Sequence, residues 1–241
     1  MATVSRWSRL RTVLGWPFGI AVVSWRYMWR TTPLHRSEET GSPAELQGLA
    51  DEALRPGDGR QPATSGVGPL LHRRYSGDIV GTQMEPDQLI DRVAGRLNQV
   101  SPEMAVFRKV RGTGGGLHEG DEVVVRMPGP WDGPVRVTHR DATSFRLSTL
   151  KGHLEAGQIE FRASRAGDAL RFEIESWARA GDRLSNLMYN KLRLAKEIQL
   201  TMWTHFVIRA ATLAKGRLRG GVTIKTHWVD WPKDDRISPP G

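Results

Sequence analysis

Short segments in which apolar and polar residues alternate constrain the fold of this chain more than any other feature. In one of them Leu170, Phe172 and Ile174 alternate with charged residues, so one face is apolar and the other charged. A period of two describes antiparallel strands with one buried and one solvated face. The pattern predicts a meander of six strands, at Ala105–Arg111, Glu122–Met127, Pro134–Arg140, Ser144–Leu150, Gln158–Ser164 and Ala169–Trp177.

Helical patterns lie on both sides of this region. A short strand, Arg73–Val80, and a helix, Met84–Leu97, precede it, and a long amphipathic helix, Arg183–Lys215, follows it. The apolar stripe of the long helix comprises Leu184, Met188, Leu192, Ala195, Met202, Phe206, Ala210 and Leu213. A sheet with one apolar face needs a cover. We therefore expect an α+β fold in which a curved antiparallel sheet of six to seven strands wraps around this C-terminal helix.

Composition divides the chain into four segments. Residues 1–36 are rich in Trp and Arg and predict an amphipathic helical extension. Residues 37–68 are acidic, contain several Pro and Gly, and predict a linker. Residues 69–219 form the predicted sheet-and-helix domain, and residues 220–241 are expected to be a tail.

The positive charge of the chain is concentrated at two places. The net charge is +9, and residues 1–36 contain six arginines and no acidic residue. Residues 183–219 contain eight basic residues against Glu197 alone. This asymmetry favours anionic partners such as lipid headgroups, nucleic acid or an acidic protein. A solvated basic helix face is the alternative for residues 183–219. Nucleic-acid binding is not predicted, because these basic residues do not form one stripe with stacking aromatic residues.

The N-terminal extension predicts contact with a membrane surface. Its apolar stretch, residues 13–25, would span about 20 Å as a helix, less than the ~30 Å hydrocarbon core of a bilayer. Trp and Arg at the ends of a short apolar helix suit the membrane interface. We expect a cytoplasmic protein that contacts the anionic inner face of the membrane through Trp7, Trp16, Phe18, Trp25 and Trp29. The alternatives are a helix that packs on the domain or on a second subunit, and a secretory signal.

Several classes of site are excluded or disfavoured. The chain has no cysteine, so disulfides, Cys-ligated zinc, iron–sulfur clusters and thiol catalysis are excluded. The seven histidines show no His-x-x-x-His spacing, so neither a metal site nor a cofactor is predicted. The segment 112–116 is Gly-rich but lacks the Lys-Ser/Thr of a phosphate-binding loop.

The order of elements is that of the START-like helix-grip proteins, and two motifs are more specific. Residues 149–161, with Gly152-His153, Gly157 and Phe161, and then residues 172–177, resemble the bacterial and plant family known as domain of unknown function 1990. The resemblance covers about residues 70–218. Gln158 and Ile159 stand where the family has two glutamates, so a role of those acids does not carry over. The resemblance implies a space between sheet and helix that holds an apolar ligand in many members of the superfamily.

We expect such a ligand to be a small apolar molecule or lipid. Three polar residues share the predicted apolar faces: His139 and Ser176 continue strand alternation, and Gln199 lies in the helix stripe. The predicted cavity lining is His139, Phe145, Phe161, Phe172, Ser176, Met188, Gln199, Met202, Trp203 and Phe206. One alternative is a filled core in which Gln199 and Ser176 are structural. The other is a cyclase- or hydrolase-like enzyme that uses His139 or His153 as its base.

Overall fold

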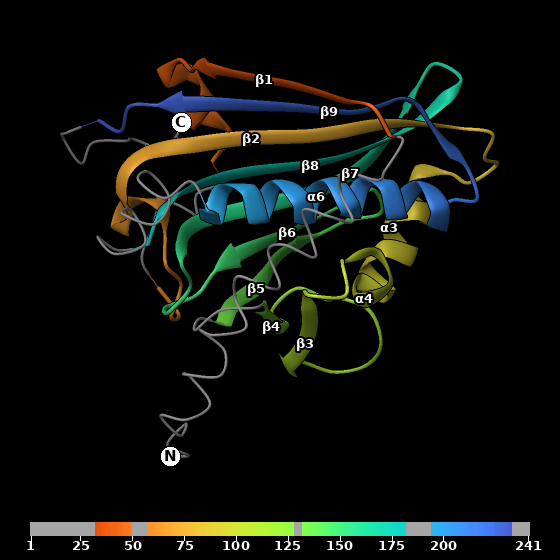
Figure 1. Ribbon diagram of the computed structural model, residues 1–241. Helices are drawn as coiled ribbons and strands as arrows, with labels where there is room; N and C mark the ends of the chain where they lie inside the picture. Colours follow the sequence, from red (N-terminus) through yellow and green to blue (C-terminus); the bar gives the residue numbers. More distant parts are fainter. Residues whose placement is uncertain (1–31, 50–56, 128–131, 182–193, 233–241) are drawn as a thin grey trace.

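The computed structural model describes residues 32–49, 57–127, 132–181 and 194–232, whose strands form a single curved sheet with the helices packed against it (Figure 1). The strands are β1 (Leu34–Thr40), β2 (Val67–Val80), β3 (Val106–Arg111), β4 (Glu122–Arg126), β5 (Asp132–Arg140), β6 (Ser144–Thr149), β7 (Glu155–Ala166), β8 (Ala169–Ala180) and β9 (Arg217–Val229). The helices are η1 (Pro43–Gly48), η2 (Ala63–Ser65), α3 (Pro86–Gly95), α4 (Leu97–Val100) and α6 (Leu194–Leu213).

The nine described strands form one sheet in the order β1-β9-β2-β8-β7-β6-β5-β4-β3. The six predicted strands between residues 105 and 177 are confirmed as β3 to β8, with each paired to the next in the chain. The predicted α+β class is confirmed as well. The sheet is larger than the six to seven strands expected, and it is mixed, because β1 runs parallel to β9.

Strand β9 corrects the prediction of a C-terminal tail beginning at residue 220. It pairs antiparallel with β2 and so lies inside the sheet rather than outside the domain. Val222 and Ile224 are almost fully buried and show the alternation of a strand. The pattern is short and follows two glycines, Gly220 and Gly221, which obscured it in the sequence.

The described parts of residues 37–68 correct the prediction of a linker. Strand β1 adds to the outer edge of β9 in the register Leu34↔Val222 to Thr40↔Trp228. It has no apolar alternation, because an edge strand is held by backbone hydrogen bonds and most of its side chains are exposed. The segment that follows packs on the sheet in a small apolar cluster of Leu46, Leu49, Ala63, Leu70, Trp177 and Val229.

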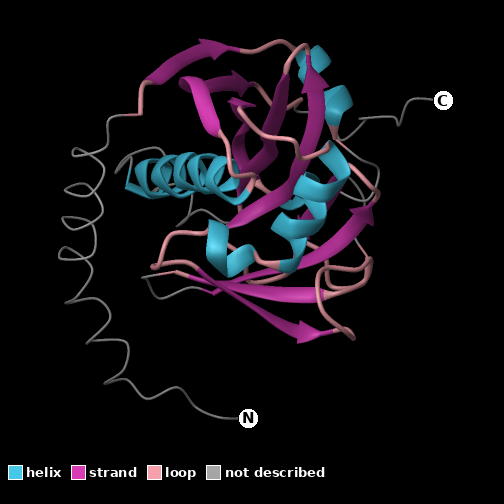
Figure 2. Cartoon of the chain, turned by 90° about the vertical axis from the view of Figure 1, so that its right-hand side faces the viewer, coloured by secondary structure: helices cyan, strands magenta, loops and turns pink. Residues whose placement is uncertain are grey.

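Helix α6 lies within the curve of the sheet, with α3 and α4 against it (Figures 1 and 2). Phe206, Val207, Ala210 and Ala211 are all buried, so the helix is apolar on more than the single predicted stripe. The reason is that β2, β8 and β9 cover one side of the helix while α3 and α4 cover another. The predicted start of this helix at Arg183 falls in residues 182–193, outside the described residues.

The chain approaches β2 closely at the C-terminal end of α6. Lys215 adopts the left-handed conformation with φ 57°, and the amide of Gly216 donates to the carbonyl of Ala211. A Cβ on Gly216 would lie 2.5 Å from a methyl carbon of Ile79 in β2. Glycine is therefore needed here for the close approach of the chain to β2, and β9 starts at the next residue.

Candidate functional site

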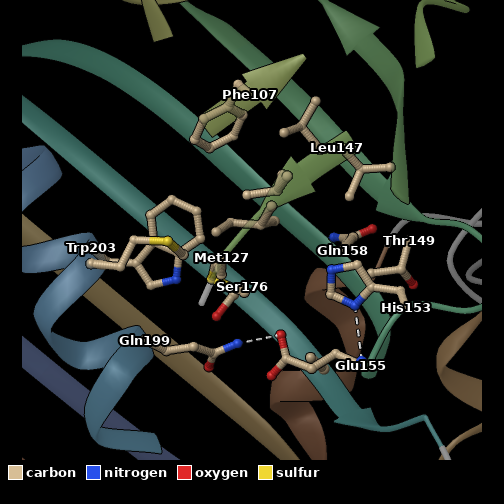
Figure 3. A pocket seen from close by; sticks show the side chains of 15 residues that line it. Phe107, Met127, Leu147, Thr149, His153, Glu155, Gln158, Ser176, Gln199 and Trp203 are labelled. Carbon is tan, nitrogen blue, oxygen red and sulfur yellow. Dashed lines mark hydrogen bonds between the residues drawn. The ribbon is translucent and has the colours of Figure 1, made fainter. Parts of the chain in front are cut away.

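A cavity lies between the concave face of the sheet and the N-terminal half of the described part of α6 (Figure 3). Its apolar walls are Phe107, Val125, Met127, Val135, Leu147, Ile159, Ala178, Met202 and Trp203. Its polar residues are Thr149, His153, Glu155, Gln158, Ser176 and Gln199. The space open to the centre of a water molecule is about 50 Å³, and one water needs about 10–15 Å³ on that measure. The cavity therefore holds a few waters or a small organic group.

Gln199 and Glu155 join α6 to β7 at one end of this cavity. The side-chain amide of Gln199 donates to Oε2 of Glu155 over 2.6 Å (Figure 3). Arg73, a buried residue of β2, donates to the amide oxygen of Gln199. Since its oxygen faces a cation and its nitrogen faces a carboxylate, the orientation of Gln199 is determined by its neighbours.

His153 contributes a second polar group with a defined proton position. Its Nδ1 accepts a hydrogen bond of 2.9 Å from the backbone amide of Glu155. Burial lowers the pKa of His153 below its ordinary value, although the Glu155 carboxylate acts in the opposite direction. The neutral ring therefore carries its proton on Nε2 and acts there as a donor. A base at Nε2 would require the other tautomer, which the amide of Glu155 opposes.

The turn that presents His153 and Glu155 is fixed from outside the sheet. The side chain of Gln61 donates to the carbonyls of His153 and Glu155, at 2.9 and 3.0 Å. Thr149 Oγ1 accepts from the amide of Gly157 over 3.0 Å. Gly157 has φ 151°, and a Cβ there would lie 2.1 Å from the carbonyl oxygen of Trp177. Only glycine fits at this position of the predicted family motif.

The comparison with protein families agrees with these motifs. The model of the family described as "Domain of unknown function (DUF1990)" matches residues 72–209, more than half of the chain. The chain belongs to this family. No curated protein matches this chain.

Solved structures of low identity also match this DUF1990 protein. The solution structure of KanY is 9% identical with a TM-score of 0.45, and it covers 59% of this chain and 96% of its own. A norcoclaurine synthase of Thalictrum is 13% identical with a TM-score of 0.44, over 62% and 97% of the two chains. The di-domain StfQ of the steffimycin biosynthetic pathway is 6% identical with a TM-score of 0.45, over 61% and 51%.

Four of the predicted cavity residues line the cavity of the DUF1990 protein: Ser176, Gln199, Met202 and Trp203. Four others, Phe145, Phe161, Phe172 and Phe206, are fully buried in the main core. Their rings pack on one another, with Phe145 and Phe161 stacked at 4.6 Å between centroids. They fill the space between sheet and α6 beyond the cavity. Met188 lies outside the described residues.

The prediction that His139 faces the cavity is wrong. The pairing of β5 with β6 shifts register between Val137 and His139, so the alternation changes face at this irregularity. His139 now lies opposite Arg146, and its Nε2 lies 3.0 Å from Asp141 at the exposed end of the strand. Among the described residues, the histidine that lines the cavity is His153, whose Nε2 is a donor in this geometry.

The sequence pattern predicted neither Glu155 as a cavity residue nor Gln61 as the residue that holds the turn beside it. The predicted strand began at Gln158, whereas β7 begins at Glu155, and the extension places Glu155 on the same face as Ile159 and Phe161. Continuing the alternation through Gly157 would have revealed it. No local pattern pointed to Gln61, because it precedes the domain and reaches the site only through the fold. Gln158 donates its side-chain amide to the carbonyl of Gly48, which gives it a structural contact with η1.

The N-terminal residues predicted to contact a membrane, Trp7, Trp16, Phe18, Trp25 and Trp29, lie outside the described residues. Within the described part of the chain, none of the helices has the length and apolar character needed to cross a bilayer.

Proposed function

We propose that the DUF1990 protein binds a small, mainly apolar molecule that carries a hydroxyl or similar hydrogen-bonding group at one end. The observation that carries this proposal is the placement of the Glu155 carboxylate and the His153 ring in a cavity whose walls are otherwise mostly apolar. Ligand sites in proteins combine apolar walls with a few convergent polar groups that orient the ligand.

The two polar groups define the chemistry of the ligand. Glu155 is an acceptor, and His153 offers an N–H at Nε2 because its Nδ1 already accepts the amide of Glu155. A hydroxyl group can donate to the first and accept from the second. Gln199 acts indirectly, since it bonds to both Glu155 and Arg73 and so positions the carboxylate.

The size of the cavity favours a ligand about as large as a single ring. A larger molecule would need movement of Met202 or Trp203, which form the α6 wall. Methionine has an unbranched, flexible side chain, so this wall can adapt more readily than the β-branched residues of the sheet. The proposed occupant is therefore a small ring or a short chain with one polar end.

The test compares 4-methylphenol with toluene, which has the same methyl-substituted ring but lacks the hydroxyl group. Each is added to the full chain carrying ¹³C-methyl methionine, and methyl shifts are followed by NMR. Met127 and Met202 line the cavity, whereas Met84 is buried in the core away from it. We expect 4-methylphenol to shift the signals of Met127 and Met202 and to leave that of Met84 unchanged.

Three variants make this test specific. Ala178→Leu fills the cavity and should abolish the shifts, while the exposed Val110→Leu is the matched control. Glu155→Gln should weaken binding of 4-methylphenol more than that of toluene. Equal shifts at all three methionines, or none, would contradict the proposal. Native mass spectrometry of protein purified gently from its own host would identify a resident ligand directly.

We also propose that residues 1–31 bring the protein to an anionic membrane surface. The support is the sequence pattern of Trp and Arg around a short apolar stretch. Full-length protein should sediment with phosphatidylglycerol vesicles more than with phosphatidylcholine vesicles. Replacing Trp7, Trp16, Trp25 and Trp29 by Ala should remove this difference, and unchanged sedimentation would refute the proposal.

A further inference from the structure

Three potential metal ligands meet on the outer face of the sheet, opposite the cavity. His72 of β2 and His227 of β9 are direct partners across the two strands. Glu45 of η1 lies over them, and its Oε2 is 2.5 Å from Nδ1 of His72 and 2.8 Å from Nδ1 of His227. The three ligand atoms all lie within 4.8 Å of one another.

Each of the three side chains is oriented by a further contact. Glu45 closes the capping box of η1, so that its Oε1 accepts the amide of Ser42 over 3.2 Å and its Oε2 is left facing the histidines. The ring of His72 stacks on Trp177 with centroids 4.9 Å apart. The ring of His227 meets the ring of His72 edge-on, with centroids 5.9 Å apart. The ligand set is thus arranged by the fold before anything binds.

His72 also contacts a second carboxylate. Its Nε2 lies 2.7 Å from Oε1 of Glu175, whose side chain is only 3% exposed. Arg74 donates to the same oxygen over 2.5 Å, and Arg162 donates to the other oxygen. Glu175 is therefore a buried carboxylate held in place by two arginines, and it fixes the plane of the His72 ring.

One ring nitrogen of His72 has no proton to donate to its carboxylate neighbour, so it can bind a cation instead. A neutral imidazole has one N–H, yet both ring nitrogens of His72 face carboxylate oxygens. If Nε2 donates to Glu175, the lone pair of Nδ1 points toward Glu45 and His227. A metal ion at this position would accept that lone pair and the Glu45 carboxylate together. A ligating histidine whose other nitrogen donates to a carboxylate is a common arrangement in metal sites.

We propose that Glu45, His72 and His227 bind a divalent transition-metal ion of the zinc type, with Glu175 as the carboxylate that orients His72. Two imidazoles and one carboxylate match the ligands that zinc prefers. Tetrahedral Zn–N and Zn–O bonds of about 2.0–2.2 Å place ligand atoms about 3.4 Å apart, so Oε2 of Glu45 needs to move away from each histidine nitrogen by less than about 1 Å. The His227 side chain is 29% exposed, so solvent has access to an ion at this site and water could complete its coordination.

Such an ion would link three segments that are distant in sequence. Glu45 belongs to η1, and His72 and His227 are 155 positions apart on neighbouring strands. Because only the folded protein brings the three ligands together, metal binding would stabilise the attachment of η1 to the sheet. No His-x-x-x-His spacing signals this site, because its ligands converge only when β9 pairs with β2.

The test is titration of untagged, EDTA-treated full-length protein with Zn²⁺ by isothermal calorimetry. We expect one ion per chain and an increase of Tm in its presence. His227→Gln, the most exposed of the three ligands, should weaken binding at least tenfold while the far-UV circular dichroism stays unchanged. Glu45→Gln and His72→Gln should do the same. His35→Gln, on the adjacent strand β1, is the matched control and should bind as the unmodified protein does.

Cobalt(II) provides an independent readout. The visible absorption of Co²⁺ bound to the unmodified protein should show the intense bands of a four-coordinate site, and these should be lost in His227→Gln. Absence of Zn²⁺ binding would overturn the proposal, as would equal affinity of the three ligand variants and the control. Either result would mark Glu45, His72 and His227 as a hydrogen-bonding cluster that fastens η1 to the sheet.

Discussion

Gln199 of α6 donates to Glu155 of β7 over 2.6 Å, and this bond connects the helix with the sheet inside the cavity. Gln199→Leu removes the amide that lies between Glu155 and Arg73, so both charged groups lose this partner. We expect the free energy of unfolding to fall by about 1–3 kcal/mol, measured by urea denaturation. The control is Met202→Leu, a volume-conserving change on the same helix with a loss below about 1.5 kcal/mol. A Gln199→Leu variant as stable as the control would show that this bond contributes little.

His153 should be a neutral ring protonated on Nε2 at pH 7. The reason is that Nδ1 accepts the amide of Glu155 and that burial lowers the pKa of the ring. Since the unfolded chain has a histidine pKa of about 6.5, the unfolded state binds the proton more readily. The stabilisation is therefore complete above pH ~6.5 and is lost as the pH falls toward the pKa of the folded state. Nitrogen-15 NMR of the imidazole measures both the tautomer and the pKa of His153. An Nδ1–H tautomer would contradict the proton position, and a pKa that is not lowered would contradict the pH dependence.

The charged carboxylate of Asp121 should stabilise the β3–β4 connection, and this stabilisation should be lost in acid. Burial would raise the pKa of Asp121, but the Lys109 ammonium at 2.7 Å and the amide of His118 outweigh it and hold that pKa below its ordinary value. Asp121→Asn should lower the free energy of unfolding by about 1–3 kcal/mol at pH 7.

The stability difference between the unmodified protein and Asp121→Asn should shrink as the pH falls below ~4, because the carboxyl group of the unmodified protein then becomes protonated in both states. Urea denaturation at a series of pH values measures this difference. A difference that stays constant from pH 7 to the acid range would contradict the role of the Asp121 charge.

Gly157→Ala should be among the most destabilising single substitutions in the described part of the sheet. The new Cβ would lie 2.1 Å from the carbonyl oxygen of Trp177, and the residue has φ 151°. We expect a loss of about 2–4 kcal/mol. Gly167→Ala is the matched control: its φ is 62° but no atom lies within 4 Å of the new Cβ, so about 1 kcal/mol should be lost. Equal losses in urea denaturation would show that the conformation of the backbone, not the contact with Trp177, determines the cost.

Much of the sheet could be predicted because its signal is local. In β8, Leu170, Phe172 and Ile174 are buried while Arg171 is exposed, as their alternation indicates. The same holds for α3, whose Pro86 and Asp87 mark a helix start. Two polar residues of the cavity, Ser176 and Gln199, could be named for the same reason, since each continues a regular pattern without interruption.

At other positions strand alternation does not predict which way a side chain faces, because the pairing of the strands is irregular there. The register shift between Val137 and His139 turns His139 outward, and a parity argument carries no information across such a shift. Strand β1 is held by backbone hydrogen bonds to β9, for which no side-chain pattern is required. The four phenylalanines predicted to line the cavity are buried in the core beside it, because the extent of the space left open depends on how their rings pack.

The sequence by itself determined the strands, the long helix and the apolar faces that meet in the core, because each depends on residues near one another in the chain. Only the tertiary structure decided which polar groups share a site. Glu155 and Gln199 meet because α6 packs across the concave face of the sheet, and Glu45, His72 and His227 meet because β9 pairs with β2. Contacts between distant segments depend on strand order and register, and these follow from the packing of the whole chain.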